Sequence, residues 1–361
     1  MNEYQESAAV MKERQYDLLT IGRSSIDLYS NDIGARFEDI TAFAALVGGC
    51  PTNVAVGTKR LGLNSVLLTA VGNDPVGDFV LSFLMKEGVD TTFIARKAGH
   101  RTSAVLLGIE PPDRFPLVFY RDNCADIELT IDDVENAPIA QCRALLVSGT
   151  GLSREPSRSA TFRAVEIARQ NNTAVFVDLD FRPDQWSNYP GGDVRAYGIT
   201  MRHLIPFVDI VIGTEDEVKA VYIKSKDDVT VISSQVSGAT ICGEAENAVQ
   251  QLLASSLKAV ALKRGKSGST VYLPGGKSFA AQPFPVEAMN VLGAGDAFAS
   301  GFIYGYLKGK DWKDCAALGN AAGAIVVTRQ GCANAMPRES ELLSFMNQHY
   351  ELRTKESSCR T

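Results

Sequence analysis

The segment 290–307, NVLGAGDAFASGFIYGYL, places one acidic side chain among small residues at the start of a predicted helix. Gly293, Ala294 and Gly295 are small enough for another group to approach the backbone. Apolar residues then recur at helical spacing, which predicts three backbone N–H groups at a helix N-terminus, where an anion is attracted. Asp296 in this first turn is either a favourable helix-start residue or, beside a bound phosphate, a base that takes a proton from an attacking hydroxyl.

A second candidate is the segment 47–63, VGGCPTNVAVGTKRLGL. Gly48 and Gly49 end an apolar stretch, Pro51 suits the first position of a helix, and Asn53 then projects from its first turn. A glycine pair permits close approach of a ligand, and an amide both donates and accepts hydrogen bonds from a polyol. A tight turn capped by Asn53 would give the same pattern, so both interpretations stay open at this point.

Three further polar residues are candidates for ligand contacts. Asp27 lies just beyond the first predicted strand, at the carboxyl end where open α/β sheets bind their ligands, although an isolated Asp is also common in turns. Arg121 and Arg182 carry forked donors suited to carboxylate or phosphate oxygens. Either arginine could equally be the partner in a surface ion pair.

The elements that must position these residues alternate between short runs rich in Val, Ile and Leu and longer amphipathic stretches. This pattern is typical of a doubly wound α/β fold, with a mostly parallel sheet covered by helices on both faces. The expected strands are 17–22, 65–71, 144–148, 174–178, 209–212, 259–263 and 269–273. The expected helices are 52–61, 76–87, 154–171, 244–256 and 295–308.

Two pieces do not fit this alternation. Residues 102–121, TSAVLLGIEPPDRFPLVFYR, predict two strands joined by a Pro-containing turn, and 24–47 is the second piece. Together they predict either a small β flap over one edge of the main domain or a pair of edge hairpins with no role at a site. The polar, weakly periodic segment 224–243 predicts a surface loop.

Composition and charge exclude several classes of protein. The 361 residues include 36 basic and 42 acidic side chains, a net charge of −6, without the basic excess that nucleic-acid binding requires. No apolar run approaches the ~20 residues of a membrane span, and the polar start is unlike a signal peptide, so we expect a cytoplasmic protein. Seven scattered cysteines without a C-x-x-C and three histidines argue against disulfide frameworks and zinc sites.

Two familiar nucleotide motifs are absent. Gly265-Lys266-Ser267 resembles the end of a P-loop motif, but Val260 stands five positions earlier, where that motif requires a glycine. No G-x-G-x-x-G follows the first predicted strand, which removes the main support for a nicotinamide-dependent oxidoreductase.

At this point the residues resemble the ribokinase-like, PfkB-type carbohydrate kinases, over about 17–337. The amino-terminal signature of that family is met by Gly48, Gly49, Asn53, Ala55, Gly62 and Gly72, and its carboxy-terminal signature by 290–303. The resemblance implies a single α/β kinase domain over 1–361, with a small β lid formed by about 24–47 and 99–124. It also implies ATP and Mg²⁺ as cofactors, and relatives leave a homodimer through the lid open.

The resemblance also assigns the phosphoryl-transfer and sugar residues one by one. It makes Asp296 the catalytic base and the amides of Gly293, Ala294 and Gly295 the anion hole. The sugar would be held by Asp27, Gly48, Gly49 and Asn53, under a lid that excludes water.

The nucleotide residues follow in the same way. The resemblance gives Lys263, Gly265 and Gly268 to ATP, places Asn320 near the adenine, and lets Glu217 orient Mg²⁺ through water. Thr214 stands where the family has Asn, which leaves its role open. Asn290 stands where cation-binding relatives often have Asp, which leaves a monovalent cation open, and Asp180 stands where sugar-acid kinases tend to carry Asn.

Among these kinases the segments IGRSSIDLY, VGGCPTN, YRDNCAD, GTEDE and MNVLGAGDAF most resemble the 5-dehydro-2-deoxygluconokinases of myo-inositol breakdown. Their reaction converts 5-dehydro-2-deoxygluconate and ATP to 6-phospho-5-dehydro-2-deoxygluconate and ADP. Arg121 or Arg182 would suit the substrate carboxylate. A 2-keto-3-deoxygluconate kinase or another PfkB-type sugar kinase is the alternative within the fold. A non-catalytic sugar-binding protein is the alternative of another class, and it would show damage at Gly293, Gly295 or Asp296, which is not seen.

Overall fold

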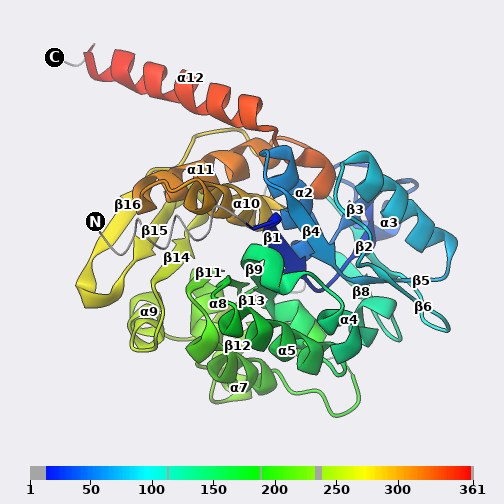
Figure 1. Cartoon of the computed structure of the whole chain (residues 1–361). Helices are drawn as coiled ribbons and strands as arrows, with labels where there is room; N and C mark the ends of the chain where they lie inside the picture. The colour runs from blue at the N-terminus through cyan, green and yellow to red at the C-terminus, as the bar shows by residue number, and fades with distance from the viewer. Residues whose placement is uncertain (1–13, 112–113, 188, 232–237, 359–361) are drawn as a thin grey trace.

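The computed structural model describes residues 14–111, 114–187, 189–231 and 238–358. Its centre is an eight-stranded sheet, parallel from β4 to β14 with two antiparallel strands added at one edge, as expected for a doubly wound α/β fold (Figure 1). In spatial order the strands are β16 (Ser278–Ala281), β15 (Ser269–Tyr272), β14 (Ala259–Lys263), β11 (Ile210–Thr214), β10 (Ala174–Asp178), β9 (Cys142–Ser148), β1 (Tyr16–Ile21) and β4 (Ser65–Leu68).

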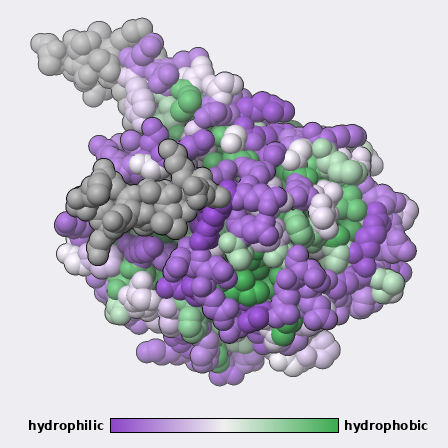
Figure 2. Space-filling model, viewed as in Figure 1, coloured by the Kyte–Doolittle hydropathy of each residue, from purple (hydrophilic) through white to green (hydrophobic). Residues whose placement is uncertain are grey.

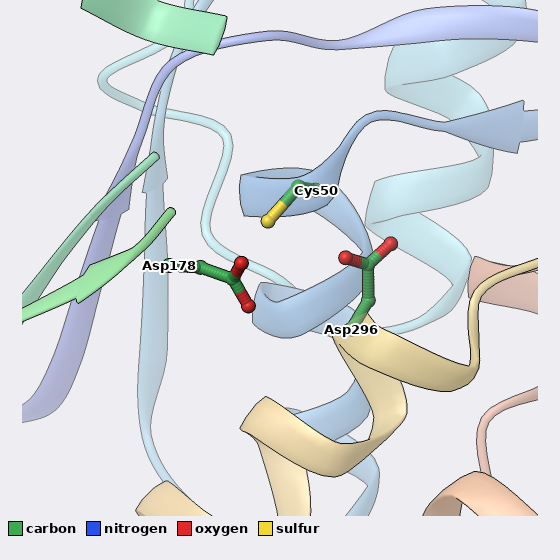
Figure 3. A group of neighbouring side chains, drawn as sticks. All are labelled: Cys50, Asp178 and Asp296. Carbon is green, nitrogen blue, oxygen red and sulfur yellow. The ribbon is translucent and has the colours of Figure 1, made fainter. Parts of the chain in front are cut away.

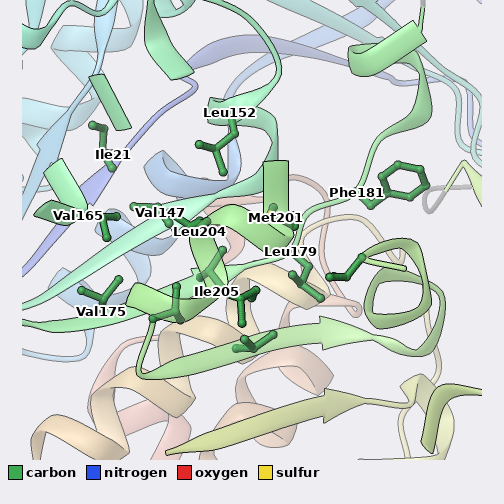
Figure 4. Packing of buried hydrophobic residues seen from close by; sticks show 14 of the residues in the cluster. Ile21, Val147, Leu152, Val165, Val175, Leu179, Phe181, Met201, Leu204 and Ile205 are labelled. Atoms are coloured by element: carbon green, nitrogen blue, oxygen red, sulfur yellow. The ribbon is translucent and has the colours of Figure 1, made fainter. Parts of the chain in front are cut away.

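Alternate residues of the central strands feed two separate hydrophobic cores. Leu145 and Val175 belong to the core on one face of the sheet, whereas Leu146 and Phe176 belong to the core on the other. Successive side chains of a strand point to opposite faces, so a strand covered on both faces must be apolar throughout. Figure 4 shows part of the first core, in which Val147 and Val175 share a cluster with helical side chains.

Helices cover both faces of the sheet (Figure 1). The first core is closed by α4 (Ile131–Glu135), α5 (Ser157–Gln170), α7 (Arg195–Leu204), α8 (Glu215–Ala220) and α9 (Ala245–Leu253). The second core is closed by α2 (Cys50–Arg60), α10 (Ala294–Leu307) and α11 (Trp312–Val326). The short α6 (Pro183–Ser187) follows β10, and α12 (Glu339–Ser358) extends away from the body at the top left of Figure 1.

A second sheet of four strands packs beside the main domain, in the order β3 (Phe43–Gly48), β2 (Ser25–Ser30), β7 (Ser103–Leu107) and β8 (Leu117–Tyr120). We call these four strands the lid sheet, after the role predicted for 24–47 and 99–124, and α3 (Pro75–Lys86) contacts β2 on the same side of the molecule (Figure 1). The strands β7 and β8 are antiparallel, which confirms the pair predicted within 102–121. Tyr29 and Val105 of this sheet cluster with Leu292 and Cys332, so the lid sheet contacts the segment that leads into α10.

Two local predictions were wrong. The single strand expected over 65–71 is divided into β4 and β5 (Ala70–Gly72), because β5 leaves the main sheet to pair with β6 (Ala95–Lys97). The surface loop expected over 224–243 contains the antiparallel pair β12 (Val229–Val231) and β13 (Ala239–Ile241), while 232–237 lie outside the described residues. Ala239 and Ile241 are buried against the first core, a tertiary contact that the polar sequence around them conceals.

The visible surface is mainly hydrophilic, with hydrophobic residues scattered between hydrophilic ones (Figure 2). Within the described ranges, none of the helices has both the length and the apolar composition that a membrane crossing requires.

Candidate active site

The candidate site residues gather at the carboxyl edge of the main sheet. Asp178 ends β10, Thr214 ends β11 and Lys263 ends β14, while the N-termini of α2 and α10 arrive at the same edge. Parallel strands all end on one side, so residues that are far apart in the sequence meet there.

The start of α10 is shaped by two glycines. Gly293 is the N-cap residue and has a left-handed backbone (φ 79°), and a Cβ on it would lie 2.8 Å from Sγ of Cys332. A Cβ on Gly295 would lie 3.2 Å from Nζ of Lys263. The first-turn amides of 293–295 therefore lie beside an ammonium group, an arrangement suited to a phosphate.

Asp296, in the first turn of α10, is held by the first turn of α2. Its Oδ2 accepts a hydrogen bond of 2.6 Å from Nδ2 of Asn53. Burial raises the pKa of Asp296, the charge of Asp180 raises it further, and the Asn53 hydrogen bond and the charge of Lys263 oppose this. A carboxylate with a raised pKa is a stronger base toward a hydroxyl proton. Oδ1 of Asn53 is buried without a hydrogen-bond partner among the described residues, so it can accept from a substrate hydroxyl.

Two further groups surround the base. The thiol of Cys50 and the carboxylates of Asp178 and Asp296 lie within 4.8 Å of one another and point toward a common centre (Figure 3). Burial raises the pKa of the Cys50 thiol well above its usual value, so the thiol stays protonated and is a poor metal ligand. Neither Cys50 nor Asp178 was predicted from the sequence to be a site residue. The rule that selected Asp27, a polar residue at a strand's carboxyl end, also fits Asp178.

Lys263 forms a buried ion-pair group with two carboxylates. Its Nζ lies 3.3 Å from Oδ2 of Asp178 and 3.7 Å from Oε2 of Glu217. Burial raises the pKa of Asp178 to about 7, against the lowering effect of the Lys263 charge. Burial alone would lower the pKa of Lys263, but the charges of Asp178 and Glu217 outweigh it and raise that pKa. The lysine is therefore charged and close to the amides that open α10.

Thr214 has a clear local function. It is the N-cap residue of α8, where its side chain accepts from the N–H of Glu217 at 3.3 Å and the Glu217 carboxylate accepts from the N–H of Thr214 at 2.7 Å. This reciprocal capping box explains why a residue other than Asn serves here. Only Oε2 of Glu217 is used in it, which leaves the second oxygen for a cation or its water.

The three other residues assigned to ATP lie around the hairpin of β14 and β15. Gly265 and Gly268 both have left-handed backbones, with φ 52° and 83°, and a Cβ on Gly268 would lie 2.3 Å from the carbonyl of Ala281. Nδ2 of Asn320 donates to the carbonyls of Ala281 and Gln282 at 3.0 and 3.1 Å. Asn320 thus fixes the chain after β16 against α11, and its place beside the adenine stays a prediction.

The predicted sugar residues meet where the lid sheet joins α2. Oδ1 of Asp27 accepts from Oγ of Ser25 at 2.7 Å, and burial raises the pKa of Asp27 to about 6. A Cβ on Gly48 would lie 1.8 Å from Oδ2 of Asp27, so the absence of a side chain makes room for that carboxylate. Gly49 has φ 107°, and a Cβ there would lie 2.3 Å from the carbonyl of Arg23.

The two arginines differ in their surroundings. Arg121 is buried, with its guanidinium 2.6 Å from Oδ2 of Asp126, and it donates to the carbonyl of Thr150 at 2.9 Å and to Oε1 of Gln185 at 3.0 Å. The geometry therefore does not support Arg121 as a substrate ligand, because protein acceptors already occupy its donors. Arg182 lies closer to the base: its Nε is 3.1 Å from Oδ1 of Asp180, and its charge lowers the pKa of Asp296.

Comparisons with known proteins identify the family of this chain. Residues 15–339 match the pfkB family of carbohydrate kinases. The chain belongs to this family. Curated relatives include a 5-dehydro-2-deoxygluconokinase of Geobacillus thermodenitrificans, 33% identical over 93% of this chain and 94% of the relative. A 5-dehydro-2-deoxygluconokinase of Bacillus subtilis is 34% identical over 92% of this chain and 96% of the relative.

Solved structures confirm the ribokinase-like fold. A ribokinase II from E. coli in complex with ATP and Mg²⁺ has a TM-score of 0.79 and 24% identity, covering 92% of this chain and all of that one. A fructokinase from Xylella fastidiosa with bound ATP has a TM-score of 0.78 and 23% identity, covering 92% of this chain and 99% of that one. As a member of the pfkB family, the chain is a kinase that phosphorylates a sugar hydroxyl.

Asn290 is the residue for which the sequence left a monovalent cation site open. This residue is fully buried, its Oδ1 accepts from the N–H of Leu292 at 3.0 Å, and its Nδ2 has no hydrogen-bond partner among the residues described. A neutral amide whose oxygen already accepts a hydrogen bond is a weaker ligand for a monovalent cation than a carboxylate is.

Proposed function

We propose that this kinase transfers the γ-phosphoryl group of ATP to the 6-hydroxyl of 5-dehydro-2-deoxygluconate, giving 6-phospho-5-dehydro-2-deoxygluconate and ADP. The observation that carries the chemistry is the buried carboxylate of Asp296, oriented by Asn53 and next to the amide-lined start of α10. The assignment of this substrate is based on the names of the relatives that match almost the whole chain.

In the proposed reaction, Asn53 and Asp27 hold the sugar so that its hydroxyl faces Asp296. Asp296 takes the hydroxyl proton as the oxygen attacks the γ-phosphorus, and the bond from that phosphorus to the β,γ-bridging oxygen breaks, which releases ADP. The amides of 293–295 and the charge of Lys263 stabilise the negative charge on the transferred group. Both are fixed before the reaction, so little reorganisation is needed.

Magnesium has a suitable donor set on the nucleotide side. Glu217 and Asp178 offer hard oxygen ligands, and the carboxylates around Lys263 outnumber its single positive charge. Glu217 is the residue that we expect to orient the ion through water, because its Oε1 is not used in the capping box. When bound with ATP, Mg²⁺ neutralises charge on the phosphates.

We also propose that the lid sheet covers the bound sugar and mediates a homodimer. It packs on Leu292, directly before the anion-binding turn, so it is well placed to exclude water. Its strand β8 exposes Val118 and Tyr120, 42% and 58% accessible, and is an edge strand with no further partner strand among the described residues. Light scattering on the purified protein would test the dimer, and a monomer at micromolar concentration would refute it.

A single substitution tests the mechanism. Asp296→Asn keeps the shape of the side chain but removes the base, so kcat should fall by about 10² to 10⁴-fold while ATP binding is retained. The matched control is Asp314→Asn, because Asp314 occupies the first turn of α11 but is exposed. Near-normal turnover by Asp296→Asn would overturn the assignment of the base.

Substrate identity needs a separate experiment. ATP consumption is measured with 5-dehydro-2-deoxygluconate, 2-keto-3-deoxygluconate, fructose and ribose, and we expect the highest kcat/KM for the first acid. A preference for 2-keto-3-deoxygluconate would replace the proposed substrate but would not affect the proposed mechanism. Sugar binding without ATP consumption would instead favour a non-catalytic binding protein.

A further inference from the structure

Arg23 is a buried cation that pairs with no carboxylate of the described residues. It follows β1 at the carboxyl edge of the main sheet and is only 9% exposed. Among the residues described, it has no carboxylate oxygen within 4.0 Å, whereas Arg121 and Arg182 each have one. Burying an unpaired charge is costly, so a buried arginine in this state calls for an anion from elsewhere.

The contacts of the guanidinium leave one edge unused. Nη1 donates to Oγ of Ser25 at 2.7 Å. Nε is buried without a hydrogen-bond partner, and Nη2 has no such partner within the described part of the chain. Nε–H and Nη2–H form one edge of the planar group, with the spacing that binds both oxygens of a carboxylate.

Arg23 lies beside the proposed sugar site. Its carbonyl accepts from Oγ1 of Thr52 at 3.1 Å and would lie 2.3 Å from a Cβ on Gly49, so its backbone contacts the first turn of α2. Ser25 bridges its side chain to Asp27, because Oγ of Ser25 donates on to Oδ1 of Asp27 at 2.7 Å. The ring of Phe119, on β8 of the lid sheet, lies 5.4 Å from the guanidinium carbon. A ligand held by Asp27 and covered by the lid sheet would therefore reach this side chain.

We propose that Arg23 binds the carboxylate of the sugar acid and thereby selects acidic over neutral substrates. This inference rests on the proposed function, since it assigns one end of the same substrate. Arg121 could bind a carboxylate only by giving up its buried pairing with Asp126, and Arg182 is already paired with Asp180. Arg23 can bind one without breaking an ion pair to a described residue. The competing role is that of a simple counter-charge to Asp27, whose pKa Arg23 lowers.

The test compares the sugar acid with its neutral carboxamide, which has nearly the same shape but no charge. Arg23→Gln can keep the hydrogen bond to Ser25 and removes the charge, so KM for the acid should rise about 10- to 100-fold. We expect kcat at saturation and KM for the carboxamide to change by less than about threefold. The variant Arg23→Lys keeps the charge without the fork and should recover part of the affinity for the acid.

Each outcome decides the assignment. If Arg23→Gln raised KM equally for the acid and the carboxamide, Arg23 would only support Asp27. If the ratio of the two KM values did not change from wild type, another group would bind the carboxylate. Either result overturns the inference and leaves the kinase function intact. If Arg23→Gln does not fold, Arg23→Lys provides the same test, since it should raise KM for the acid and leave KM for the carboxamide unchanged. A wild-type enzyme that prefers neutral sugars would overturn both the inference and the proposed substrate.

Discussion

Replacing Gly48 with alanine should displace the carboxylate of Asp27. A Cβ on Gly48 would lie 1.8 Å from Oδ2, 2.3 Å from Cγ and 2.6 Å from Oδ1 of Asp27. Restoring ordinary contact requires a shift of about 1.5 Å, and a misplacement of about 1 Å in a substrate-positioning group can cost about 10²-fold. We expect kcat/KM for the sugar acid to fall by at least that factor, and the overpacking to destabilise the fold by about 1–3 kcal/mol.

A double-mutant cycle isolates this clash. Asp27→Ala removes the three atoms that the new methyl group would meet, so Gly48→Ala should cost at least about 1 kcal/mol less stability in that background. Gly151→Ala is the control, because its Cβ would have its nearest neighbour at 3.6 Å and its backbone is of an ordinary type. Thermal unfolding and steady-state kinetics are measured on all variants. Equal destabilisation by Gly48→Ala with and without Asp27, or kcat/KM within about threefold of wild type, would refute the reasoning.

Three further predictions follow from the same contacts. Burial raises the pKa of Asp27 from 3.8 to about 6, so its charge lowers stability above pH 6 and has no effect below about pH 4. Asp27→Asn should therefore raise the free energy of unfolding by up to about 3 kcal/mol at pH 7.5 but not at pH 4, as thermal unfolding at the two pH values would show. Thr214→Ala removes the N-cap of α8 and should cost about 1 kcal/mol in urea unfolding, whereas Thr214→Asn should cost almost nothing. Arg121→Met leaves Asp126 charged and buried, so it should lower stability by about 3–5 kcal/mol; a stable variant with a raised KM for the acid would restore Arg121 as a ligand.

The fold was largely predictable because each local signal agreed with the tertiary arrangement. The strands β10 and β14 have the predicted limits, since a strand covered on both faces must be continuously apolar. The pair β12 and β13 was missed because its pairing depends on contacts with the first core, which a polar sequence does not reveal. The helices α4, α6, α7, α8, α11 and α12 were also not predicted.

The sequence by itself determined the residues of the proposed reacting end of the site. The glycines and Asp296 are adjacent along the chain, so their spacing alone predicts a helix start with a carboxylate in its first turn. Only the tertiary structure decided which buried groups surround that turn. Cys50, Asp178 and Lys263 come from three separate elements, and the roles of the arginines depend on which carboxylates fold against them. A carboxylate 2.6 Å away favours a structural role for Arg121, and the absence of one within 4.0 Å among the described residues makes Arg23 a candidate ligand. The energy of an ion pair depends on the distance between its charges in the folded chain, and the order of residues in the sequence does not give that distance.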